Sequence, residues 1–182
     1  MINLLPETPA QGLLSTETEG SALAEFVPEA ITWIAPFKGK EDSVSQDLLR
    51  SVGCGFPKAN ELTSKDRVRV VSIAPSEALV IGAELDIEDA ATADQTDAWC
   101  ILHLSGITSR DVLARLTSVD LRPQNFPVGR TARTVIGHMT GSVSRLDDDT
   151  WEIMVFRSMS RSAIHELEKA MRAVAAREAL KT

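Results

Sequence analysis

The apolar residues of this 182-residue chain fall in short runs that follow the same order twice. Each series reads as a buried strand, an amphipathic helix, a loop and two strands joined by a turn, first over residues 31–82 and again over residues 99–157. The two series share negligible sequence identity, so only their pattern repeats. We therefore expect an α+β fold, built from two similar strand-helix-hairpin halves with mainly antiparallel sheets.

The first series places a mostly buried strand at residues 31–35. A helix capped by Ser43 and ended by Gly53 should follow it. The apolar stripe that predicts this helix consists of Val44, Leu48, Leu49 and Val52. Residues 67–74 and 78–82 flank a Pro-Ser turn and indicate a hairpin.

The second series predicts a strand over residues 99–104 and a short helix after it. Strands should then run from 130 to about 146 and from 150 to 156, with the three aspartates at 147–149 joining the last two strands of the series. A final amphipathic helix should start at about residue 160, and its buried stripe consists of Ile164, Leu167, Met171 and Val174.

The chain divides into an arm, residues 1–28, and a body, residues 29–182, whose halves span about 30–83 and 97–180. The connector between the halves, residues 84–96, is acidic and predicts a short helix or loop. The arm mixes proline, glycine and acidic residues without a sustained period, which indicates an extended segment. Its scattered apolar residues leave two interpretations open, a flexible terminus or an arm that lies along a partner subunit: Leu4, Leu5, Leu13, Leu14 and Phe26.

The composition argues against nucleic acid and membrane partners. The net charge is −7, whereas binding along a phosphate backbone needs clustered cations. The chain has no tyrosine and only 4% aromatic residues, so it lacks platforms on which bases could stack. Apolar residues at 43% and charged residues at 25% are typical of a soluble globular protein, and no apolar run approaches the roughly 20 residues that span a bilayer.

The cysteines and the first residues bear on the compartment. Cys54 and Cys100 are the only cysteines, and neither has a second cysteine or a histidine at zinc-ligand spacing. No lysine or arginine precedes Lys38, so the N-terminus lacks the basic region of a secretory signal. We expect a protein without a zinc site in a reducing compartment, the cytoplasm.

The histidines favour structural roles over catalytic ones. His103 should lie on the face of its strand opposite Leu102 and Leu104, as a polar-face or packed side chain rather than a general base. His138 is expected within a strand, in a structural or interface role. His165 lies beside two glutamates on the charged face of the last helix.

The remaining motifs are too weak to indicate an active site. There is no GxSxG motif for a hydrolase, and Cys100, between apolar neighbours, should be buried and inert. Cys54 is the more exposed candidate thiol, but little near it could lower its pKa. The Gly-Cys-Gly stretch at 53–55 follows a helix and lacks the third glycine of a dinucleotide loop. The aspartates at 147–149 lack EF-hand spacing and suit an exposed hairpin tip better than a calcium site.

Arg122, Arg130 and Arg133 fall close together in the sequence after the second helix. Guanidinium groups pair with carboxylates and anions in two-pronged geometry. We interpret these arginines as ion-pairing residues of an interface with a partner, and a small anionic ligand such as a folate tail is the alternative.

The second half resembles the sarcosine oxidase gamma subunit family. The likeness extends over nearly all of the chain from about residue 30 and is strongest over residues 97–172. It consists of long strings in the right order, which is more specific than a short motif: DAWCILHLSG at 97–106, DVLARL at 111–116, DLRP at 120–123, FPVGR at 126–130, RTVIGHM at 133–139, WEIMVFRSM at 151–159 and HELE at 165–168.

The resemblance implies a fold related to the folate-binding domain of the glycine-cleavage T-protein. It also implies alpha, beta and delta subunits as partners in a complex that oxidatively demethylates sarcosine to glycine and passes the one-carbon unit to tetrahydrofolate. FAD, FMN, NAD, tetrahydrofolate and zinc would then be held by the other subunits. No catalytic, cofactor-binding or metal-binding residue carries over to this chain.

Three alternatives and one departure from the family accompany this interpretation. The chain could serve a related N-methyl amino acid dehydrogenase, such as an N-methylglutamate dehydrogenase, or be a folate-dependent one-carbon transferase, although it is short for the latter. A free-standing adaptor domain is a further possibility. The acidic N-terminal arm has no counterpart that we can match in the family, so a docking role for residues 1–28 is a separate hypothesis.

Overall fold

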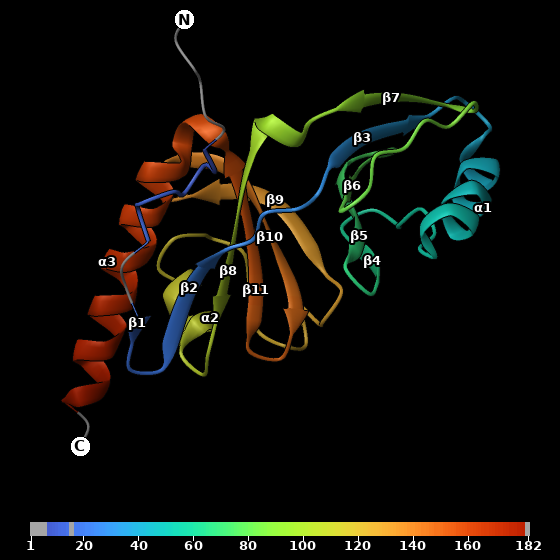
Figure 1. The fold of residues 1–182 in the computed structure, drawn as a ribbon. Helices are drawn as coiled ribbons and strands as arrows, with labels where there is room; N and C mark the ends of the chain where they lie inside the picture. The colour runs from blue at the N-terminus through green and yellow to red at the C-terminus, as the bar shows by residue number, and fades with distance from the viewer. Residues whose placement is uncertain (1–6, 15–16, 181–182) are drawn as a thin grey trace, which may run out of the picture.

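The first half of the protein is an antiparallel sheet with one helix on its outer face. A computed structural model describes residues 7–14 and 17–180 (Figure 1). Helix α1, Glu41–Val52, covers the outer face of this sheet. Over the described residues the sheet has five strands, in spatial order β4 (Leu62–Lys65), β5 (Val68–Ala74), β6 (Glu77–Ile81), β3 (Ile31–Pro36) and β7 (Ala90–Asp94).

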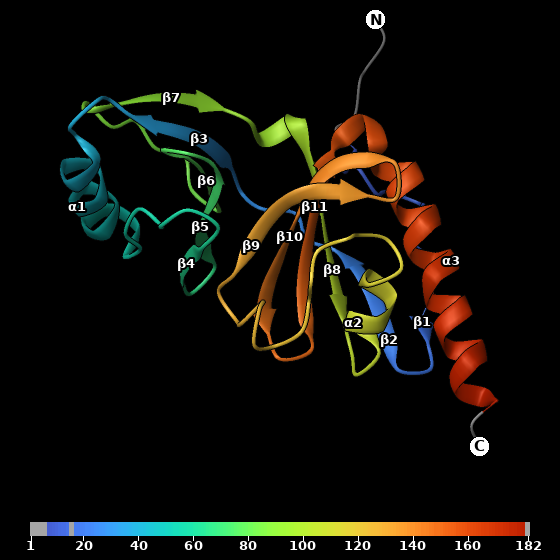
Figure 2. The same ribbon diagram turned by 180° about the vertical axis from the view of Figure 1, so that it is seen from behind.

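The second half is a larger antiparallel sheet with helices α2, Ser109–Leu113, and α3, Ser160–Ala179, on its outer side (Figure 2). Two short 3-10 helices, Thr96–Ala98 and Arg157–Met159, flank this sheet. Over the described residues it has six strands, in spatial order β1 (Glu17–Thr18), β2 (Ser21–Glu25), β8 (Trp99–Ser105), β11 (Thr150–Phe156), β10 (Met139–Asp147) and β9 (Thr131–Ile136).

The two sheets have the same topology. The order β4-β5-β6-β3-β7 in the first corresponds, strand for strand, to β9-β10-β11-β8-β2 in the second. The strand before each half's first strand is exchanged: β2 precedes β3 in sequence but pairs with β8, and β7 precedes β8 but pairs with β3. The duplication that the sequence pattern predicts is therefore present, and each half is completed by a strand that leads into the other.

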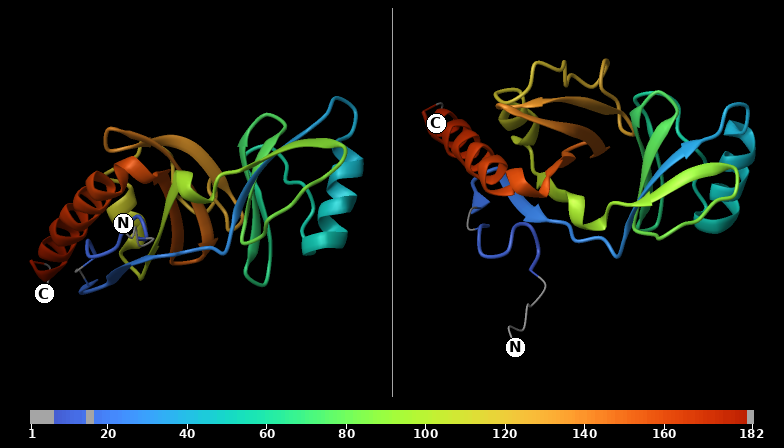
Figure 3. Two further views of the ribbon diagram at one scale, coloured as in Figure 1. Left: turned by 45° about the horizontal axis from the view of Figure 1, so that its top comes forward. Right: turned by 90° about the horizontal axis from the view of Figure 1, so that it is seen from above.

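The sheets pack face to face between the two sets of helices, so the molecule has four layers with α1 and α3 at opposite ends (Figure 3). Strict alternation sends side chains to the two faces of each strand. In β8, Cys100, Leu102 and Leu104 join the core under α3. Trp99 and Ile101 join the core between the sheets, opposite residues of β3, β5 and β6.

Several local expectations hold and others need correction. The α+β class, the antiparallel hairpins and the final helix from Ser160 are as predicted. Helix α1 ends at Gly53 as expected but begins at Glu41, and Ser43 is not its cap. Ser43 lies in the first turn, where it hydrogen-bonds the Asp89 carboxylate, and this bond together with Lys40 lowers the Asp89 pKa.

The acidic connector is the first larger correction. Residues 84–96 contain strand β7 rather than only a helix or loop, because the backbone of Ala90–Asp94 pairs antiparallel with β3. The second is the stretch 130–146, which forms two strands, β9 and β10, with a turn between them.

Much of the predicted arm, residues 1–28, packs against the second half. Strand β2 pairs with β8, and Ala10 is buried in the core under α3 with Leu13 and Leu14 against it. The apolar residues Leu4 and Leu5 lie outside the described residues.

Candidate functional site

A group of charged and aromatic side chains, two of them buried and two half-buried, lies at the junction of the two sheets, and we call it the junction cluster: Phe26, Arg69, His103 and Glu152. Glu152 of β11 is fully buried, and its Oε2 accepts a hydrogen bond from the Arg69 guanidinium of β5. His103 Nε2, from β8, lies 3.3 Å from the same oxygen. The Glu152 carboxylate thus contacts both Arg69 of the first half and His103 on the neighbouring strand of the second half.

Phe26 completes the cluster at the point where the chain crosses from β2 to the first half. Its ring stacks on His103 with centroids 4.9 Å apart, and the Arg69 guanidinium carbon lies 4.5 Å from its ring centroid. The Phe26 backbone N–H donates to the Ile101 carbonyl at 2.9 Å. Stacking and cation–π contact therefore fix the crossing segment against both sheets.

Strand alternation explains why these polar groups face inward. His103 lies opposite Leu102 and Leu104, as the pattern predicts, and Glu152 lies opposite Trp151 and Ile153. Register pairs His103 directly with Glu152 across β8 and β11. The cluster thus occupies the inner faces, at the end of the apolar core between the sheets.

The geometry suits a structural ion pair better than acid–base catalysis. The Glu152 carboxylate is fully buried, remote from water, and hydrogen-bonded to the Arg69 guanidinium. Arg69 Nε and Glu152 Oε1 lack hydrogen-bond partners among the described residues, so the pair is only partly satisfied. Breaking it would leave one charge buried alone.

A hollow of about 310 Å³ opens beside Phe26, at the ends of β2 and β8. Its apolar wall includes Val27 and Trp99, and its polar residues include Glu25 and Arg157. The Glu25 carboxylate already accepts hydrogen bonds from the Thr8 hydroxyl at 2.6 Å and from a backbone N–H at 2.8 Å. Both Glu25 oxygens are therefore already hydrogen-bonded within the chain, so this carboxylate is poorly placed to act as a base on a substrate in the hollow.

The other candidate histidines lie away from the junction cluster. His138 occupies the turn between β9 and β10 and is exposed, so its predicted place within a strand is wrong. His165 is exposed on α3, as the helix pattern indicates. The histidines are thus distributed over separate parts of the fold.

Both cysteines are buried. Cys54 is 3% exposed and Cys100 is fully buried, so Cys54 is the more exposed of the two thiols, as predicted, but only by a small margin. Burial raises the pKa of Cys54, and its Sγ lies 3.8 Å from the Val68 carbonyl oxygen. Burial raises the pKa of Cys100 to about 12. A thiol of raised pKa holds little thiolate at neutral pH and is a poor nucleophile.

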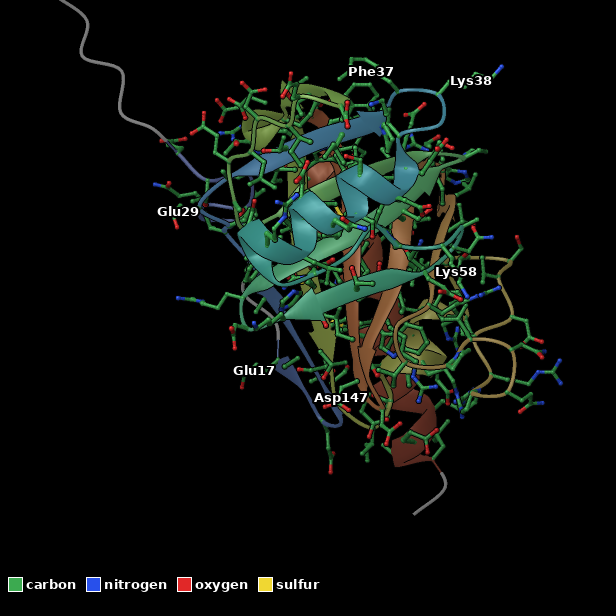
Figure 4. All side chains as sticks on the ribbon, turned by 90° about the vertical axis from the view of Figure 1, so that its right-hand side faces the viewer. Glu17, Glu29, Phe37, Lys38, Lys58 and Asp147 are labelled. Atoms are coloured by element: carbon green, nitrogen blue, oxygen red, sulfur yellow. The ribbon has the colours of Figure 1, made fainter. Side chains whose placement is uncertain are left out.

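Ion pairs within the chain occupy the acidic hairpin tip and Arg122, one of the three arginines that the sequence analysis singled out. The Arg145 guanidinium binds Asp148 at 3.2 Å at the tip of β10–β11, and Figure 4 shows the neighbouring Asp147. Arg122 pairs with Asp120 and holds the pKa of that carboxyl well below its usual value. Over residues 7–14 and 17–180, no three His, Cys, Asp or Glu side chains are grouped as metal ligands.

Arg130 and Arg133 have different surroundings from Arg122. Arg130 lies 3.7 Å from Glu61 of the first half, while Arg133 lines a small hollow beside the β5–β6 turn. The three arginines that lie close together in the sequence therefore have three different surroundings in the fold. Arg69 and Glu152 do not stand out in the sequence, where the signal for each is one charged residue within a strand that is otherwise rich in apolar residues.

Comparison with known families decides the relationship of the chain. The model of the sarcosine oxidase, gamma subunit family matches residues 78–171. The chain belongs to this family. The matched region includes Glu152 and His103 of the junction cluster, whereas Phe26 and Arg69 precede it. A search of curated protein sequences finds no significant match.

Solved structures show the same fold in two settings. A chain of heterotetrameric sarcosine oxidase from Corynebacterium sp. U-96, solved with pyrrole 2-carboxylate, matches with a TM-score of 0.81 at 20% identity, over 94% of this chain and 97% of that one. Glycine cleavage system aminomethyltransferase T from Bartonella henselae matches with a TM-score of 0.54 at 10% identity, over 81% of this chain and 45% of that one. The predicted relation to the T-protein fold is confirmed.

Within the described residues, no helix is both long and apolar enough to cross a membrane.

Proposed function

We propose that the chain is the accessory gamma subunit of a heterotetrameric sarcosine oxidase and assembles with alpha, beta and delta subunits. The observation that carries the proposal is membership of the gamma subunit family. The fold match to a chain of heterotetrameric sarcosine oxidase, over nearly the full length of both chains, supports it. In this role the chain takes part in an oxidoreductase complex of the cytoplasm that demethylates sarcosine to glycine.

The chemistry belongs, in this proposal, to the partner subunits. FAD, FMN, NAD, tetrahydrofolate and zinc would be held there, and the one-carbon unit would pass to tetrahydrofolate there. The arrangement of this chain supports such a division: its buried carboxylate, Glu152, is engaged by Arg69, and its two thiols are buried with raised pKa values. These groups stabilise the fold and are poorly placed to react with a substrate.

The domain organisation that we propose has two halves completed by exchanged strands. Residues 1–6 precede the described core, and docking of this end on a partner remains a proposal that a short deletion would test. Removing residues 1–6 spares Ala10 and strand β2, which belong to the second half. A deletion through residue 28 would remove β2 and would report on folding instead.

The proposal is tested by co-expressing the tagged chain with the other three subunits and recording the visible spectrum of the purified product. Co-purification with flavin absorbance in a stable complex is expected. A chain that purifies alone, without a flavoprotein, would contradict the proposal and favour a free-standing adaptor.

A second assay separates the remaining alternatives. The resemblance to aminomethyltransferase T favours a folate-dependent transferase, although this chain matches only 45% of that protein. Folate binding by the isolated chain, measured calorimetrically, would support that alternative. A complex that oxidises another N-methyl amino acid in preference to sarcosine would instead point to a related dehydrogenase.

A further inference from the structure

Over the described residues, strand β9 forms one edge of the six-stranded sheet and pairs with one strand, β10, while an isolated bridge between Glu61 and Arg130 lies just before it. The hydrogen-bond pattern of an antiparallel pair alternates, so every second residue directs its backbone groups toward the partner. The Arg145 N–H donates to the Arg130 carbonyl at 2.9 Å, which sets this alternation. The N–H and C=O groups of Thr131, Arg133 and Val135 therefore point away from β10, toward the open edge.

The chain itself covers both ends of this edge. The Thr131 N–H donates to the Asn60 carbonyl at 3.0 Å, and the Gly137 N–H donates to the Leu116 carbonyl at 2.7 Å. Between them, Arg133 and Val135 have exposed side chains, and Val135 is 52% exposed. The Thr134 hydroxyl reaches the Val135 carbonyl only at 3.5 Å. The open stretch spans about 20 Å, room for a strand of a few residues.

A hollow of about 230 Å³ adjoins this edge on the side that faces the first half. Arg133 forms one wall, and Ile73 and Pro75 of the β5–β6 turn region form another. Asn60 also lines the hollow, two residues after Lys58, and Figure 4 shows Lys58 at the rim of the first half. A strand added along β9 could place alternate side chains in this hollow.

The charge beside the edge selects the kind of strand that would bind. Over residues 7–14 and 17–180, neither Lys58 nor Arg133 makes an ion pair, although the whole chain carries a net charge of −7. Uncompensated cations beside open backbone groups favour a segment that carries carboxylates.

We propose that the β9 edge is a docking site for an extended, acidic segment of a partner subunit, which adds to the sheet as a further strand. The inference rests on the proposed function, because it assigns the surface through which the subunit would assemble. Backbone hydrogen bonds at Arg133 and Val135 would supply affinity, and carboxylates near Arg133 and Lys58 would supply specificity.

The sharpest variant is Val135→Pro, with Val135→Thr as its matched control. Proline removes the outward N–H, and it is tolerated at an edge position whose N–H makes no bond within the sheet. Threonine keeps both the N–H and the branched side chain. When the purified chain is titrated with the other purified subunits, Val135→Pro should raise the Kd at least about tenfold and Val135→Thr should leave it near wild type.

Two further measurements keep the test independent of the proline's effect on folding. Arg133→Glu leaves the backbone intact and should weaken assembly, with less dependence on salt than wild type. In the wild-type complex, hydrogen exchange at the amides of Arg133 and Val135 should slow relative to the free chain.

The outcomes separate this inference from the proposed function. If wild type assembles and all three variants bind equally well, with unchanged exchange at Arg133 and Val135, the docking site is refuted and the function stands. If wild type fails to assemble, the proposed function fails and this inference falls with it. If the isolated chain dimerises and Val135→Pro makes it monomeric, the strand comes from a second copy, which overturns the assignment to a partner subunit.

Discussion

The two halves have the same order of strands but different outer layers. The first sheet is covered by the single 12-residue helix α1, whereas the second is covered by the 20-residue helix α3, by α2 and by the long loop that carries Leu121 and Phe126 into the core. The outer core of the second half is accordingly larger and includes the fully buried Trp151. One topology thus supports two cores of different size, because the covering elements rather than the sheet determine how much apolar surface is buried.

The inner faces differ less, because each sheet meets the other there. An apolar core joins them, and the Arg69–Glu152 pair joins them at its end. The exchange of β2 and β7 adds backbone hydrogen bonds that neither half could make alone. Because the exchange is reciprocal, each half relies on the other for part of its packing and hydrogen bonding.

The largest effect is expected where the halves meet. Glu152→Gln removes the charge that compensates Arg69 and should lower the free energy of unfolding by about 3–5 kcal/mol. Denaturation with urea, followed by fluorescence, measures it. The double variant Arg69→Met with Glu152→Leu should recover most of the loss, since paired apolar residues can replace a buried ion pair. A double variant as unstable as Glu152→Gln would show that the cluster acts otherwise.

The next effect compares the two outer cores. Leu48 of α1 and Leu167 of α3 are both fully buried, and alanine at either position should lower the unfolding free energy by about 2–5 kcal/mol. Because exchanged strands tie the halves together, each variant should shift a single transition. Fluorescence variants that retain only Trp33 or only Trp151 report on the two halves separately. If the Trp33 and Trp151 signals of Leu48→Ala gave different unfolding midpoints, the first half would unfold on its own, contrary to this prediction.

A smaller difference is expected between equivalent turns. Gly39 precedes α1 and Gly106 precedes α2, and both have positive φ, 79° and 113°. A Cβ at Gly39 would meet nothing within 4 Å, but one at Gly106 would lie 2.3 Å from the Gly20 carbonyl oxygen. Gly39→Ala should cost about 1–2 kcal/mol from backbone strain, and Gly106→Ala about 1–3 kcal/mol more from the clash. If thermal unfolding gave the same loss of stability for both variants, the close approach of Gly106 to the Gly20 carbonyl would be contradicted.

The smallest effect concerns the long loop of the second half. Hydrogen bonds from Arg122 lower the Asp120 pKa from 3.8, so the charged form is favoured in the folded state. This contribution is complete above the unfolded pKa and is lost as pH falls below about 4 toward the lowered folded value. Asp120→Asn should show a slightly smaller loss of stability than wild type on acidification through this window. Unfolding curves at several pH values measure the difference, and parallel profiles would remove this role for Asp120.

The sequence pattern predicted most elements within each half but not those exchanged between halves. Strands with clear alternation, such as β8 and β11, were found because one face meets an apolar core. Strand β7 consists mostly of small residues within an acidic segment, a composition typical of a loop. Strand β2 lies in a stretch rich in proline, glycine and glutamate. Both are strands because a neighbouring strand offers backbone partners, which composition does not reveal.

The junction cluster shows the same limit at the level of single residues. The face of His103 followed from its neighbours, because strand alternation is a local rule. The pairing of Arg69 with Glu152 joins residues 83 positions apart, and the pattern gave no sign of it. The sequence ranked Cys54 as more exposed than Cys100, which is correct, but it did not show how nearly buried Cys54 is, since the burial of a loop cysteine depends on what packs over it.

By itself, the sequence determined the α+β class, the repeated order of elements and the inward or outward direction of many side chains. These properties follow from periodicity within single elements, where the geometry of helix and strand is fixed. Only the tertiary structure decided the exchange of β2 and β7, the ion pair between the sheets and the open edge of β9. These depend on which distant segments meet when the two sheets pack, and that is set by the sum of contacts over the whole chain.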